Sequence, residues 1–246
     1  MKVKRRSVLT ILAGSIFWLP FAVNPAQPKD SENPKRQPQP SPAATSEAGP
    51  RYVPSKLGAP GGRVGGGTRG PASGRDIFVL SVLAPDHTGL TVREQPCLFW
   101  FISAQTTLPV EVTIVDPNAV APLLQTRIAS SVDRGVHRVS LAEHGVRLTP
   151  GVAYQWSVAV VTDDDRRAHD ILASGTIERV KAEQALVSKL SATGEAEKVG
   201  VYAEAGIWYD ALETVSDLID RSPQDPIPRR FRAALLAQVG LPEVTE

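Results

Sequence analysis

The carboxylates best placed to do chemistry are Asp163, Asp164 and Asp165, which are consecutive in the sequence. Neighbouring carboxylates can supply the hard oxygen ligands that calcium prefers, and a pair of them can transfer protons. The alternating acidic loop of calcium-binding proteins is absent, however, and Arg166 and Arg167 follow at once. We therefore interpret the cluster as a solvated hairpin tip. A calcium site at these three aspartates and an acid–base pair remain the alternatives.

Other reactive side chains are few and scattered. The single cysteine, Cys97, precedes an apolar aromatic run, which predicts a buried and unreactive thiol. One cysteine also excludes an internal disulfide and a multi-cysteine zinc site. No serine-hydrolase or zinc-hydrolase motif is present. The four histidines are not spaced as metal ligands usually are; they are His87, His137, His144 and His169. We predict no catalytic residue and no cofactor.

Two further groups of side chains suggest contacts rather than catalysis. Arg93 and Glu94 are adjacent at the edge of a predicted strand, where we expect a surface ion pair. Trp208, Tyr209 and Asp210 open a predicted helix, and Trp and Tyr are enriched among the residues that dominate protein interfaces. Packing of the two rings between helix and sheet is the favoured interpretation. A hot spot for a protein partner is the alternative, and it makes this trio the candidate binding site.

Charge is unevenly distributed along the 246 residues, whose net charge is +1. Residues 77–246 carry 15 basic and 22 acidic side chains, a net charge of −7. Because neutralisation of phosphates dominates nucleic-acid binding, an acidic body argues against a nucleic-acid partner.

Residues 1–26 have the pattern of a secretory signal peptide. Basic residues precede a short apolar run that ends at Pro20, and the run is too short to span a bilayer comfortably. Arg5 and Arg6 resemble the start of a twin-arginine signal. We expect export to the periplasm or the medium by the Sec or the twin-arginine route. The cleavage site is poorly defined, so an uncleaved leader is an alternative and is the only membrane contact expected.

Residues 27–76 are rich in Pro, Gly, Ser and charge and contain almost no large apolar side chain. Such a segment cannot bury enough surface to offset the entropy of ordering, which predicts a disordered linker. Its glycine-rich part, residues 58–70, lacks the lysine of a P-loop and the strand and helix that flank a dinucleotide loop. We expect a flexible or extended segment there, which could dock on the sandwich, with a ligand-contacting loop as the alternative.

Residues 77–181 contain short apolar runs of strand length. Seven such runs within one domain, with no helical period among them, predict an immunoglobulin-like or fibronectin-like β-sandwich. The turn Pro150–Gly151 followed by Tyr154 is typical of a tyrosine corner, in which the Tyr154 hydroxyl bonds to backbone upstream. The predicted strands are 77–84, 97–102, 110–115, 123–128, 136–141, 152–161 and 171–180.

Residues 182–246 have helical apolar spacing. Residues 192–225 partly match a single tetratricopeptide repeat. A lone repeat rarely buries a core of its own, so we expect these helices to pack on the sandwich or on a partner. A last helix is predicted over 231–239 and ends at Gly240. The positions that match the repeat are Tyr202, Gly206, Ala211 and Pro223.

Four groups of residues form a combination more specific than any of them alone. They are residues 61–70, residues 90–94 with 99–101, residues 154–156 and residues 206–212. In this order they resemble a bacterial family known as domain of unknown function 928, over residues 58–241. The resemblance implies an exported protein with no assigned activity, and it assigns no catalytic residue.

These features together predict an exported cell-envelope protein that acts as a non-catalytic protein-binding or scaffold module. Its expected partner is another envelope or secreted protein. A ligand-binding or carbohydrate-binding sandwich is the first alternative, and it requires Trp100 or Trp156 to be exposed. An enzyme that uses the cluster from Asp163 to Asp165 is the second alternative.

Overall fold

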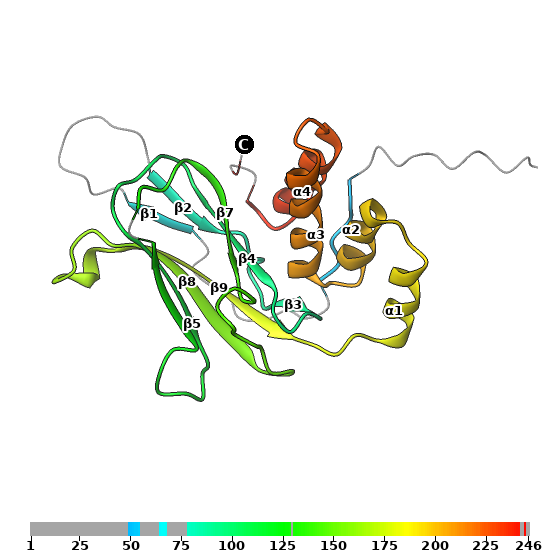
Figure 1. Ribbon diagram of the computed structural model, residues 1–246, viewed down its shortest axis with the longest axis horizontal. Coiled ribbons are helices and arrows are strands. Elements are labelled where there is room, and N and C mark those ends of the chain that lie inside the picture. Colours follow the sequence, from blue (N-terminus) through cyan, green and yellow to red (C-terminus); the bar gives the residue numbers. More distant parts are fainter. Residues whose placement is uncertain (1–48, 55–63, 68–77, 129, 242–243, 245–246) are drawn as a thin grey trace, which may run out of the picture. The chain divides into compact units, whose positions relative to one another are not determined.

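The computed structural model describes most of the chain after residue 48, as nine strands and four α-helices (Figure 1). The predicted signal peptide, 1–26, lies outside the described residues. No helix in the described part of the chain is long and apolar enough to cross a membrane. The described residues are 49–54, 64–67, 78–128, 130–241 and 244.

The first sheet has four antiparallel strands in the order β1-β2-β4-β7. Every residue of β4 is buried, and this strand lies between β2 and β7 and contacts helix α3 (Trp208–Arg221). The strands are β1 (Val64–Gly67), β2 (Phe78–Val82), β4 (Cys97–Ile102) and β7 (Gly135–Ser140).

The second sheet has five strands in the order β3-β9-β8-β5-β6. Strand β3 runs parallel to β9, and the remaining pairs are antiparallel. Along β8, buried and exposed side chains alternate at first, as the period of a strand requires. The strands are β3 (Gly89–Thr91), β5 (Val110–Val115), β6 (Leu124–Ile128), β8 (Ala153–Val160) and β9 (Ile171–Arg179).

All seven predicted strands are present, as β2, β4, β5, β6, β7, β8 and β9. The predicted tyrosine-corner hydrogen bond is also present, because the Thr149 amide donates to the Tyr154 hydroxyl at 3.1 Å. Strands β1 and β3 were not predicted. Both are very short, and β1 consists largely of glycine.

Four helices follow the sheets. Gly206, with φ +74°, ends α2, and the Ile207 amide donates to the Tyr202 carbonyl at 2.9 Å, as in a Schellman motif. Helix α4 begins before the predicted residue 231, because Asp225 caps it and a proline is well tolerated in the first turn. The helices are α1 (Gln184–Ser191), α2 (Glu195–Glu204), α3 and α4 (Pro226–Gln238).

One hydrophobic core contains side chains from both sheets and from the helices. Helix α3 contributes Trp208, Ala211, Leu212 and Val215, at the spacing of one helical face. Helix α1 differs, since none of its side chains is buried. The helices after α1 and the two sheets therefore share one interior.

The predicted linker, 27–76, is too long, because two pieces of it belong to the folded unit. Residues 64–67 form β1, whose backbone pairs with β2 without needing large side chains. Residues 49–54 carry Tyr52, which is buried in the common core. We call residues 49–54 the strap. Docking of the glycine-rich segment on the sandwich was one of the expectations, whereas the strap was not predicted, because a single aromatic ring contributes little to the average hydropathy of the segment.

Candidate functional site

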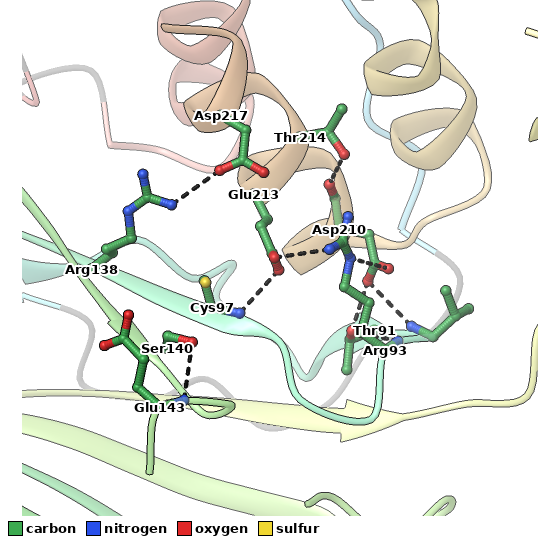
Figure 2. Close-up of polar contacts among 11 residues, drawn as sticks. Thr91, Arg93, Cys97, Arg138, Ser140, Glu143, Asp210, Glu213, Thr214 and Asp217 are labelled. Atoms are coloured by element: carbon green, nitrogen blue, oxygen red, sulfur yellow. Dashed lines mark hydrogen bonds and ion pairs between the residues drawn. The ribbon is translucent and has the colours of Figure 1, made fainter. Parts of the chain in front are cut away.

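Asp210 is fully buried at the start of α3 and bonds to the end of β3 (Figure 2). Its Oδ2 accepts a hydrogen bond from Thr91 Oγ1 at 2.7 Å and one from the Val92 amide at 3.2 Å. Its Oδ1 lies 3.4 Å from Arg93 Nε and takes part in no hydrogen bond. The carboxylate therefore fixes the first turn of α3 to the second sheet.

Glu213 lies one turn further along α3 and bonds to the same connecting segment. Its Oε1 accepts from Arg93 Nη1 at 2.9 Å, and its Oε2 accepts from the Cys97 amide at 2.9 Å. Asp210 and Glu213 together hold both ends of residues 91–97, which join β3 to β4. We call this contact between α3 and residues 91–97 the helix–sheet junction.

Burial determines the electrostatics of the helix–sheet junction. Loss of solvent raises the pKa of Asp210 to about 6, against the opposing effects of the Thr91 hydrogen bond and the Arg93 cation. Burial also raises the pKa of the Cys97 thiol to about 11, and the nearby Glu213 acts in the same direction. The thiol is therefore protonated at neutral pH, and its predicted burial is confirmed.

Trp208 and Tyr209 are fully buried and bond to the sheets rather than facing solvent. Trp208 Nε1 donates to the Leu83 carbonyl at 2.9 Å. The Tyr209 hydroxyl accepts from Trp156 Nε1 at 2.8 Å and donates to the Thr176 carbonyl at 3.1 Å. The structure thus places the candidate trio in the interior, as in the packing interpretation. In this conformation the trio offers no surface to a protein partner.

Two glycines allow this close packing. A Cβ at Gly89 would lie 2.6 Å from Tyr209 Cε2, and a Cβ at Gly175 would lie 2.8 Å from the Ala84 Cβ. Both distances are too short for carbon atoms, so any larger residue would push the helix or the strands apart.

The strap packs against the start of α3 and against α4. The Tyr52 hydroxyl lies 2.9 Å from His87 Nε2, and the Tyr52 ring meets the Trp208 ring edge-on at 4.9 Å between centroids. Gln238 of α4 accepts from the Tyr52 amide at 2.9 Å and donates to the Pro50 carbonyl at 2.8 Å. The strap is thereby joined to α4 by hydrogen bonds and to α3 by the ring contact.

The far end of α3 is attached to β7. Arg138 pairs with Asp217 at 3.0 Å and also with Asp220. Its guanidinium lies 6.0 Å from the centre of the Phe99 ring. Since these groups are partly exposed, the pairs add orientation more than stability.

The acidic cluster lies in the connection between β8 and β9, and each of its charged contacts is with an arginine. Asp164 accepts two hydrogen bonds from Arg127, at 2.8 and 3.0 Å, and Asp163 pairs with Arg166 at 2.7 Å. The Asp165 amide donates to Asp163. In the described ranges, no group of three His, Cys, Asp or Glu side chains is arranged to hold a metal ion.

The rings required by the ligand-binding alternative are not exposed. Trp100 and Trp156 are fully buried, and Trp100 stacks on His137 with 4.5 Å between ring centroids. No exposed tryptophan platform for a sugar exists in the described part of the chain.

The expected surface pair of Arg93 with Glu94 is wrong. Arg93 pairs with Asp210 and Glu213, whereas Glu94 pairs with Arg147 and with Arg179. Both side chains are partly exposed, but each is paired with residues far along the chain instead of with its neighbour. Sequence analysis did not predict the contacts of Thr91, Glu213 and His87, because the partners of these residues are far away along the chain.

The family comparison agrees with the suspected resemblance. The family model described as Domain of Unknown Function (DUF928) matches residues 64–246. The chain belongs to the DUF928 family. The match begins at β1, so the DUF928 region contains both sheets and all four described helices. No curated protein and no solved structure matches the chain.

Proposed function

We propose that this DUF928 protein is an exported, non-catalytic binding or scaffold module of the cell envelope. One observation carries the proposal: the segments that give the chain its family resemblance bind one another. Thr91 bonds to Asp210, and Trp156 bonds to Tyr209. Side chains used in this way hold helices on sheets, which favours a scaffold over an enzyme.

An immunoglobulin-like or fibronectin-like sandwich is the arrangement of the sheets that we propose. The order β9-β8-β5-β6 corresponds to strands G, F, C and C′ of such folds, and β2-β4-β7 corresponds to A, B and E. The hydrogen bond of Tyr154 to the Thr149 amide supports the same assignment.

We propose further that α2 and α3 are a single tetratricopeptide-like repeat. Gly206 forms the turn between them, Ala211 is buried, and Pro223 follows the end of α3. Repeats of this kind contact only their neighbours in the chain. Helix α1, which precedes the repeat and contacts α2, would therefore be left with one side open to a partner. Consistent with this, Val187 on α1 is 41% exposed.

Export is the part of the proposal that rests on residues 1–26 alone. The basic start and the short apolar run support a Sec or twin-arginine signal, and location in the periplasm or medium. Cell fractionation with sequencing of the mature N-terminus tests it. Recovery of the intact chain in the cytoplasm would contradict export.

Protein binding is tested by capture from envelope extract with the full chain, beside two matched surface variants. Val187→Asp changes exposed α1, and Val120→Asp changes the loop between β5 and β6, where Val120 is fully exposed. Both positions are on the surface, so both variants should fold. We expect one specific partner, lost with Val187→Asp and retained with Val120→Asp. Failure of the wild-type chain to retain any specific protein would contradict the proposal.

A further inference from the structure

The helix–sheet junction buries more negative than positive charge. Asp210 is 0% exposed and Glu213 is nearly buried, yet the pair shares one guanidinium, that of Arg93, which is itself 39% exposed. Burying an incompletely compensated charge is unfavourable. Binding of a proton to one of the two carboxylates would therefore stabilise the helix–sheet junction.

Asp210 is the carboxylate whose charge is less compensated. Both oxygens of Glu213 accept hydrogen bonds at 2.9 Å. Only one oxygen of Asp210 does so, and the other has a single 3.4 Å contact with Arg93. Proton uptake at the junction is therefore expected on Asp210 first.

The surroundings of Asp210 contain few other groups that titrate. Arg93 faces it from the segment before β4, Glu213 from its own helix, and Tyr202 from α2. Asp217 acts on Arg93 from α3, and Lys198 and Glu195 act on Tyr202 from α2. Arg93 is the one cation among the main groups that act on Asp210 in the described residues, and the hydrogen bonds from Thr91 and Val92 are the other effects that oppose burial.

We propose that Asp210 is an acid-strengthened latch, which holds α3 more tightly on residues 91–97 when it is protonated and less tightly when it is ionised. The direction follows from burial, which raises the pKa of this carboxyl from 3.8 to about 6. The folded state thus binds the proton more strongly than the unfolded state. Stability from this group is complete below about pH 4 and is lost as the pH rises through about 6.

Two aspartates of the acidic cluster behave in the opposite way. Hydrogen bonds from Arg166 and Arg127 lower the pKa of Asp163 and Asp164 respectively. Their contribution is lost only in stronger acid, as the pH falls through these lowered values. The range between pH 7 and pH 5 therefore isolates the latch from these pairs.

The test is urea unfolding of the full chain at several pH values from 7.5 to 5, for wild type, Asp210→Asn and the matched variant Glu213→Gln. Below pH 6, protonation of Asp210 should reduce the unfolding equilibrium constant by up to about tenfold per pH unit. This component should vanish in Asp210→Asn and persist in Glu213→Gln. The difference between the variants is the readout, because any pH dependence from other groups is common to both.

A second measurement does not depend on the variants folding. Carbon-13 NMR of the wild-type aspartate carboxyl groups should show one that titrates near pH 6, together with amide shifts at Val92. If every aspartate carboxyl titrates near pH 4, or if Asp210→Asn keeps the wild-type pH dependence, the latch does not exist.

Discussion

Two glycines of this chain have opposite surroundings, and their replacement by alanine should have opposite effects. A Cβ at Gly89 would lie 2.6 Å from the Tyr209 ring, whereas a Cβ at Gly200 in α2 would have no atom within 4 Å. Gly89→Ala should destabilise the protein by about 1–3 kcal/mol through overpacking. Gly200→Ala should stabilise it by about 0.5–1 kcal/mol through helix propensity. Thermal unfolding of both variants measures the difference, and equal effects would contradict the close packing at Gly89.

Removal of one hydroxyl group tests the contact between α3 and β8. In Tyr209→Phe the buried Trp156 indole N–H loses its acceptor, and the Thr176 carbonyl loses a donor. An unpaired buried group costs about 1–3 kcal/mol, so the unfolding free energy should fall by that amount. Tyr202→Phe, at a half-buried position on α2, is the control and should change little. Equal losses from both variants would show that the Tyr209 hydroxyl has no special role.

Prediction from sequence succeeded for residues whose partners are close along the chain. Tyr154 bonds to Thr149 within one turn, so a short motif identified the contact. Asp210 and Thr91 are 119 positions apart, and nothing near either residue indicates the other. The aromatic pair Trp208 and Tyr209 was ambiguous for the same reason, because burial depends on what packs against the helix.

Helix α1 should be the least stable of the described helices. It has no buried side chain and packs mainly against α2, whereas most of α3 is buried. Local opening is favoured where few apolar contacts hold an element in place. Hydrogen exchange should therefore be fast for amides of α1 and slow for amides of α3. Similar protection of the two helices would mean that α1 is held by contacts that its exposed side chains do not explain.

Longer strands were easier to predict than the two short strands that complete the sheets. Alternating or continuous apolar runs identified seven strands, including the bounds of β4 and β5. Strand β3 has three residues, and β1 is VGGG, so neither carries a period long enough to recognise. Their pairing is determined by neighbouring strands rather than by their own sequence.

At the scale of the whole molecule, the strap should be required and the preceding chain dispensable for folding. Tyr52 packs on Trp208 and bonds to His87, and Gln238 holds the strap backbone. Deletion of residues 1–48 should leave the unfolding free energy unchanged. Deletion of residues 1–54 should lower it by about 3–5 kcal/mol, the usual result of removing a buried aromatic side chain. Chemical denaturation compares the two forms, and equal stabilities would show that the strap contributes nothing.

We expect α3 to join the helices and the two sheets into one cooperative unit. Native-state hydrogen exchange at increasing urea tests it most directly, by following amides of α3, β4 and β8 together. Elements that unfold together converge on one opening free energy. We predict convergence of all three, because Asp210, Glu213 and Tyr209 tie α3 to both sheets. Exchange of α3 through an opening that leaves β4 and β8 protected would contradict the account.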